Sequence, residues 1–114
     1  MITPGYYDII APQGATYDRT FTVKTDNVPI NFTGYTAAMQ VRETYDSTAV
    51  LINLTSGSGI TLGGTAGTIQ VTIPATTTAG VPAGYYAYDL ELYAGSQVTR
   101  ILQGKFNITG EITR

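Results

Sequence analysis

The sequence contains no histidine, no cysteine and no tryptophan. Histidine is the side chain that most often transfers protons near neutral pH, and histidine and cysteine dominate zinc sites. Their absence removes the usual nucleophile–base pairs and zinc-binding arrangements, and it excludes a disulfide framework. We therefore expect no catalytic residues, no metal and no cofactor, and we predict that the protein is not an enzyme.

Charged residues are also scarce, at 12% of the chain with a net charge of −2, about half the usual share. Nucleic-acid-binding proteins usually gather lysine and arginine on one face. The six basic residues here are scattered: Arg19, Lys24, Arg42, Arg100, Lys105 and Arg114. No apolar stretch reaches the roughly 20 residues that span a bilayer. We predict neither nucleic acid nor a membrane as partner.

The residues that are abundant favour strands. The 114-residue chain has 20 threonines, 13 glycines and 9 tyrosines, and 43% of it is hydrophobic. Threonine and tyrosine suit the half-buried surface of a sheet and lose rotamer freedom in a helix. A chain of this length fits one domain with one core. The composition therefore predicts a single all-β domain.

Alternating apolar and polar residues mark several strands, in segments 37–42, 68–73 and 85–93. In the last of these, one face carries Tyr86, Tyr88, Leu90 and Leu92. Turn signals separate the segments at intervals of about 8–12 residues, which is typical of a β-sandwich. We predict an antiparallel sandwich of seven or eight short strands over residues 13–114, with a small β-barrel as the alternative.

Three irregularities refine this pattern. Gly95 lies between two long alternating runs and predicts a hairpin turn. Ile101 and Leu102 are adjacent apolar residues that break the alternation of the last run, which indicates a β-bulge or a two-sided environment. The segment 74–81 is rich in threonine and alanine after Pro74, and we expect one helical turn there.

The tyrosines are too numerous for all of them to lie in so small a core, so we expect some of them to contact a partner. Residues 1–12 form an N-terminal arm or an edge strand, with apolar residues between Pro4 and Pro12. Tyr85 and Tyr93 lie on the face opposite Leu90 and Leu92. The predicted partner-binding residues are Tyr6, Tyr7, Ile9, Ile10, Tyr85 and Tyr93. For any single tyrosine, ordinary strand packing with the hydroxyl in solvent is the alternative.

Two carboxylates, Asp89 and Glu91, are two residues apart on one strand face. Strand geometry separates such groups by about 7 Å, within the range of an inverting glycosidase. An outward-facing polar strip explains the pair more simply, because a small sandwich leaves little room for a substrate cleft. We favour that interpretation.

Three segments resemble a known family. They are the run from Asn31 to Arg42, the run from Pro82 to Leu92 with its Tyr-x-Tyr-Asp-Leu pattern, and the run from Thr99 to Phe106. Each is similar to the N-terminal domain of phage baseplate upper proteins and to related tail-associated immunoglobulin-like domains. The resemblance covers the chain from about Gly14 onward. It implies an immunoglobulin-like sandwich, a place in the virion, and other virion proteins as partners in an oligomer or symmetric array.

These observations lead to a function with two alternatives. We expect a bacteriophage virion structural protein that docks on tail, baseplate, neck or fibre components. The first alternative is a capsid decoration protein. The second is a carbohydrate-binding module that contacts a host glycan through surface tyrosines, although tryptophan, a strong sugar-stacking residue, is missing.

Overall fold

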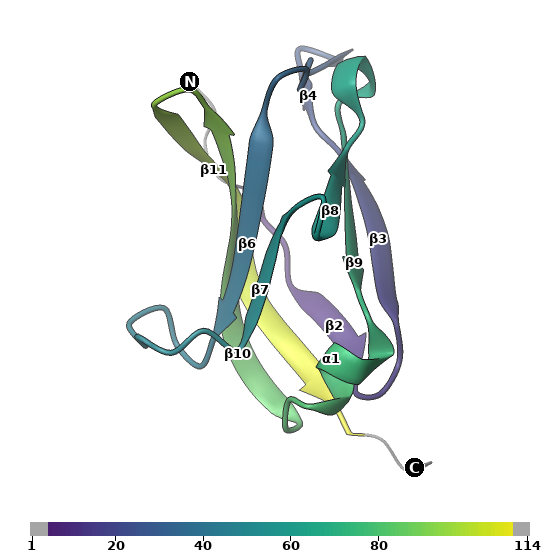
Figure 1. Cartoon of the computed structure of the whole chain (residues 1–114), viewed down its shortest axis with the longest axis vertical. Coiled ribbons are helices and arrows are strands. Elements are labelled where there is room, and N and C mark those ends of the chain that lie inside the picture. The colour runs from purple at the N-terminus through teal and green to yellow at the C-terminus, as the bar shows by residue number, and fades with distance from the viewer. Residues whose placement is uncertain (1–4, 111–114) are drawn as a thin grey trace.

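The computed structural model describes residues 5–110 and is all-β (Figure 1). The strands are β1 Gly5–Tyr6, β2 Ile9–Pro12, β3 Tyr17–Thr22, β4 Lys24–Thr25, β5 Val28–Pro29, β6 Thr36–Arg42, β7 Ile52–Ser56, β8 Gly59–Leu62, β9 Thr68–Ile73, β10 Gly84–Ala94 and β11 Gln97–Thr109. Two short helices complete the fold, the 3-10 helix η1 Gly64–Ala66 and the α-helix α1 Ala75–Ala79.

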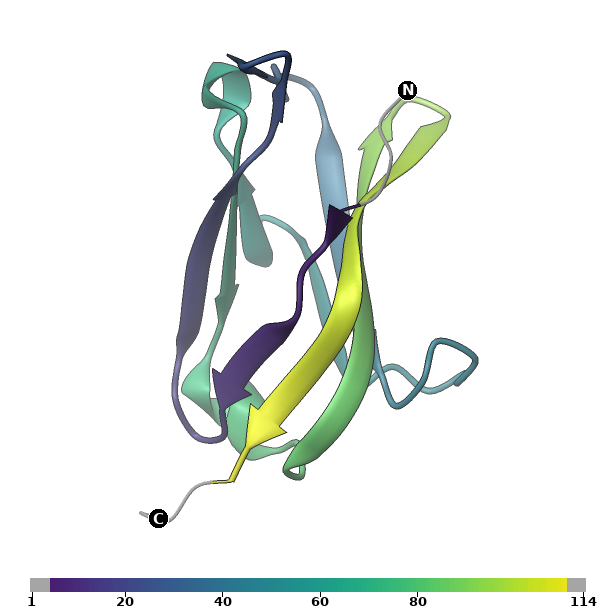
Figure 2. The same ribbon diagram turned by 180° about the vertical axis from the view of Figure 1, so that it is seen from behind.

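One curled sheet forms almost the whole domain. Its strands follow the order β1-β11-β10-β6-β7-β8-β9-β3, and β2 also pairs with β11. The sheet bends between β6 and β8, so that β9 and β3 face β10 and β11 (Figures 1 and 2). The result is a half-barrel whose two layers enclose one core, which agrees with the predicted sandwich or small barrel.

Two details differ from the sequence prediction. The described residues contain eleven strands and not seven or eight, because several strands are split into short pieces. β4 and β5, for example, form a separate hairpin whose turn residues Asp26 and Asn27 both have positive φ, as a tight turn requires. The sheet is also not purely antiparallel: β1 and β2 run parallel to β11, and β7 runs parallel to β8.

The predicted irregularities are all present. Gly95, with φ of 61°, turns the chain between β10 and β11. α1 follows Pro74, which has extended φ and ψ and is its N-cap. In the β10–β11 ladder, Leu90 pairs with Leu102 but Glu91 pairs with Arg100. Ile101 is therefore the extra residue of a β-bulge.

The core is built from the inward face of each long strand. β6, β9 and β10 alternate buried and less buried residues, as their sequences predict. The largest fully buried side chains include Phe32, Phe106, Met39, Ile60, Ile69, Leu90 and Leu92. Phe106 of β11 meets the ring of Tyr88 edge to face, with centroids 6.3 Å apart. Both layers of the curled sheet pack against this core.

The N-terminal segment joins the sheet at its edge, with residues 1–4 outside the described range. Ile9 and Ala11 of β2 are fully buried in the common core. The ring of Tyr7 packs edge to face against Phe21 of β3. The Tyr88 hydroxyl donates a hydrogen bond to the Tyr7 carbonyl. Residues 5–12 are thus edge strands of the domain itself.

Candidate functional site

The outer side of β6, β10, β11, β1 and β2 carries most of the predicted partner-binding residues. We call it the tyrosine face. Strand register places one row across it, from Gln40 through Asp89 and Gln103 to Tyr6. A second row runs from Tyr85 through Asn107 to Ile10. Its residues are Gln40, Arg42, Tyr85, Ala87, Asp89, Glu91, Tyr93, Arg100, Gln103, Lys105, Asn107, Tyr6 and Ile10.

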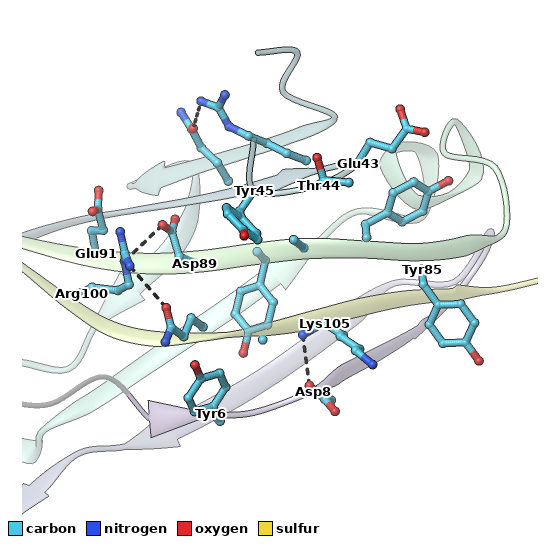
Figure 3. Close-up of a pocket in the computed structure, with 17 residues that line it drawn as sticks. Tyr6, Asp8, Glu43, Thr44, Tyr45, Tyr85, Asp89, Glu91, Arg100 and Lys105 are labelled. Carbon is cyan, nitrogen blue, oxygen red and sulfur yellow. Dashed lines mark hydrogen bonds and ion pairs between the residues drawn. The ribbon is translucent and has the colours of Figure 1, made fainter. Parts of the chain in front are cut away.

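A broad, open groove of about 1060 Å³ lies on this face. Asp89 lies on its floor, and the segment Glu43–Tyr45, which follows β6, borders it (Figure 3). Gln103 also lines the groove. Three lining tyrosines are strongly exposed: Tyr6 at 82%, Tyr45 at 86% and Tyr85 at 74%. They come from three separate parts of the chain. The fold therefore gathers exposed aromatic surface around one groove.

The β-bulge creates the polar centre of the groove. In a regular strand, Arg100 and Gln103 would point to opposite sides of the sheet. The extra residue Ile101 brings both to the outer side. There Arg100 Nε lies 3.4 Å from Asp89 Oδ2, and Arg100 Nη1 donates to Gln103 Oε1 at 3.3 Å (Figure 3).

Two of the carboxylates that line the groove, Asp89 and Glu91, interact with neighbouring side chains. Burial and the nearby Glu91 raise the pKa of Asp89, while Arg100 and Arg42 oppose this shift. Glu91 accepts a hydrogen bond of 3.1 Å from the Tyr93 hydroxyl. Burial and that hydrogen bond raise the pKa of Tyr93. The groove lining holds four carboxylates and three basic groups, which leaves a single net negative charge.

Arg42 links the sheet to the loop that borders the groove. Its Nη1 donates a hydrogen bond of 2.6 Å to the Ser47 carbonyl, and its Nη2 donates one of 2.8 Å to Gln40 Oε1. Within the loop, the Thr44 amide donates to Ser47 Oγ at 3.1 Å. These bonds position the segment that carries Tyr45 beside the sheet.

Five of the six predicted partner-binding residues reach the surface, and they divide into three groups by exposure. Tyr6, Tyr85 and Ile10, the last 62% exposed, lie open on the tyrosine face. Tyr93 is on the same face but half-buried against Glu91. Tyr7 lies at the seam with β3, half-buried under Arg19.

Ile9 requires a correction. Its side chain is 1% exposed and belongs to the core of its own domain, so it offers no surface to a partner. Alternation along β2 explains the error, because neighbouring residues of a strand point to opposite faces. Ile10 points outward, and Ile9 must then point inward.

Sequence reasoning did not select Tyr45, Gln40, Gln103 or Arg100 as site residues. The alternation of segment 37–42 places Gln40 and Arg42 on one face. A bulge at Ile101 implies that Arg100 and Gln103 share a face. Tyr45 lies in an irregular loop, so no periodic signal indicates its direction.

Metal ligands are not grouped in the part of the chain that the structure describes: no three acidic side chains lie close enough to hold an ion. Within residues 5–110, no helix has the length and apolar character needed to cross a membrane. Comparison with models of protein families finds no match, and a search of curated proteins finds none either.

Proposed function

We propose that the protein is a non-enzymatic assembly module of a bacteriophage virion that docks on another virion protein through its tyrosine face. The observation that carries this proposal is the gathering of Tyr6, Tyr45 and Tyr85 around one groove, all strongly exposed. Tyrosine and arginine are among the residues that are enriched at the energetic centres of protein interfaces, and each buried aromatic side chain removes about 150–250 Å² from water. The resemblance of segments 31–42, 82–92 and 99–106 to phage tail-associated domains supports the virion location.

Purified particles of the phage that encodes the chain provide the test. Tyr85→Ala and Tyr6→Ala together are expected to reduce the number of copies per particle at least tenfold, measured by quantitative mass spectrometry. Val28→Ala removes another well-exposed apolar side chain, 63% exposed, from the β4–β5 hairpin and is the control. Absence of the wild-type chain from particles contradicts the virion role, and normal incorporation of the double variant contradicts the docking face.

The same measurement separates the tail from the capsid. A few dozen copies per particle fit a tail, baseplate, neck or fibre component, whereas hundreds of copies fit a capsid decoration protein. We favour the tail-associated role, because the quoted segments are similar to domains of tail proteins.

Glycan binding is the second candidate, and the chemistry of the groove lining favours it. Exposed tyrosine rings can stack on sugar rings, while Gln40, Gln103 and Asp89 offer planar polar groups to sugar hydroxyls. The nearly balanced charge of the lining suits a neutral oligosaccharide better than an anionic one. A glycan array probed with the wild-type protein, Tyr85→Ala and Val28→Ala tests this. Binding that only Tyr85→Ala loses supports the glycan site, and no binding by the wild type contradicts it.

A further inference from the structure

The two edges of the curled sheet differ in how well they are protected. At one edge, β1 and β2 have only two and four residues and are interrupted at Tyr7 and Asp8. The Asp8 side chain accepts a hydrogen bond from the Lys105 amide, and Pro12 ends β2. Short, broken strands that contain proline are typical protections against pairing with another chain. This edge is therefore protected against pairing with another strand.

The other edge is β3, and it has none of these protections. β3 has six residues, without proline, lysine or a bulge, and it pairs with β9 along its full length. Among the described strands it pairs with no other. A regular edge of this length presents a row of backbone donors and acceptors that another strand can use.

The hydrogen-bond pattern identifies which backbone groups face outward. The Val23 amide donates to the Gly67 carbonyl, so Val23 and Gly67 continue the β3–β9 ladder as a directly bonded pair. Bonded and non-bonded pairs alternate in an antiparallel ladder. The amides and carbonyls of Asp18, Thr20 and Thr22 therefore point away from β9.

Both charged side chains of β3 are drawn away from this edge. Asp18 Oδ1 accepts hydrogen bonds from Gln70 Nε2 at 3.1 Å and Thr72 Oγ1 at 3.4 Å, toward β9. The Arg19 guanidinium lies over the rings of Tyr7 and Phe21, at 4.6 and 5.4 Å from their centroids. Neither charge blocks the backbone of Thr20 in the middle of the strand.

We propose that β3 pairs with β3 of a second copy of this chain, antiparallel and around a two-fold axis at Thr20. If the two-fold axis is perpendicular to the sheet, side chains that share a face in one copy lie on the same face in the other. One residue of β3 must then lie at the axis, opposite the same residue of the second copy. Centring on Asp18 or Arg19 places like charges opposite each other, which is destabilising. Centring on Phe21 leaves only the Thr20–Thr22 pairs, because Asp18 would face Lys24, which already pairs with Pro29 in the β4–β5 hairpin.

The register centred on Thr20 is the one that β3 fits. Thr20 faces Thr20 of the copy, Asp18 faces Thr22, and Arg19 faces Phe21, next to which a guanidinium already lies in the single chain. The three outward-pointing residues of each strand form bonded pairs, which joins the two curled sheets into one. This contact uses backbone groups of β3 and none of the residues of the tyrosine face, and it does not depend on the virion role.

A cysteine crosslink tests both the contact and its register, because the natural chain has no cysteine. In a bonded antiparallel pair the two Cα atoms are about 5.5 Å apart, a separation at which disulfides form. Thr20→Cys is expected to form a covalent dimer at least tenfold faster than Thr61→Cys, which lies on the same row of the sheet two strands away. Thr22→Cys is a register control, because its two copies would be about 13 Å apart.

Sedimentation measures the association of the unlinked chain. Thr20→Lys places two positive charges opposite each other and is expected to raise the dimer dissociation constant at least tenfold, whereas Thr61→Lys leaves it unchanged. Equal thermal unfolding of the two lysine variants shows that both are folded. A wild-type chain that stays monomeric at all concentrations, or equal crosslinking of Thr20→Cys and Thr61→Cys, overturns the proposal. In that case the charge of Arg19 protects the β3 edge against pairing.

Discussion

The two outer faces of the curled sheet have opposite chemistry although they cover the same core. The tyrosine face and its bordering loop carry three strongly exposed tyrosines and seven charged groups. The other outer side, which we call the threonine face, is made by Asp18, Thr20, Thr22, Asn53, Thr55, Thr61, Thr68, Gln70 and Thr72. Its single charged residue, Asp18, is bonded to Gln70 and Thr72.

This contrast separates the features that fold the chain from those that carry the proposed docking role. The inner faces of both layers carry isoleucine, valine, leucine and phenylalanine, as any sandwich requires. The threonine face consists mainly of threonine, a small β-branched residue that strands favour. Only the tyrosine face adds bulky aromatic and charged groups that strand formation does not require, which is why the proposed docking role is assigned to it.

The largest expected effect removes the core that both faces share. Phe106 is completely buried and contacts Tyr88. Phe106→Ala is expected to lower the free energy of unfolding by roughly 3–5 kcal/mol, measured by urea denaturation. Tyr85→Ala, on the outer side of the same β-ladder, should change it by no more than about 0.5 kcal/mol. Equal losses in the two variants would contradict the division into inner and outer residues.

A smaller effect is expected where the N-terminal strands meet β11. A Cβ atom on Gly104 would lie 2.5 Å from the Tyr7 carbonyl oxygen, which also accepts the Tyr88 hydrogen bond. Gly104→Ala is therefore expected to destabilise the fold by roughly 1–3 kcal/mol and to speed proteolysis near residue 7. Gly110→Ala meets only an ordinary contact with Ala83 and is the control. Unchanged unfolding of Gly104→Ala would show that β1 is not held against β11.

Loss of the Arg42 anchor should affect the tyrosine face alone. Arg42→Ala removes the hydrogen bonds to the Ser47 carbonyl and to Gln40, at a cost of about 1 kcal/mol. Hydrogen exchange should accelerate in the loop around Ser47 and stay unchanged in β9 on the threonine face. Faster exchange in both regions would mean that Arg42 stabilises the whole domain and not one face.

The smallest expected effect concerns pH. Burial and Glu91 raise the pKa of Asp89, so the folded chain binds a proton more readily at this site than the unfolded chain does. Its contribution to stability therefore falls as pH rises from about 3.8 through the raised pKa. Urea midpoints measured from pH 3 to 7 should fall less, or rise more, with pH in Asp89→Asn than in the wild type. Parallel profiles would contradict the shift.

Much of the fold could be predicted because its signals are local. The alternation in β6, β9 and β10, the turn at Gly95, the bulge at Ile101 and the helical turn after Pro74 all follow from neighbouring residues. The parallel pairing of β1 and β2 with β11 could not be predicted in this way, because it joins segments nearly a hundred residues apart. The tyrosine face depends on that same pairing, which brings Tyr6 beside Gln103. The direction of the loop that carries Tyr45 has no periodic signal either.

The bulge at Ile101 is a point at which a one-residue change can alter the shape of the tyrosine face. Deleting Ile101 would remove the bulge and leave Arg100 on the outer side, opposite Glu91, while Phe106, Ile108 and the core beyond keep their places. A one-residue deletion at this point is therefore a mutational step that could change the bend and twist of this end of the groove while keeping the same side chains on it.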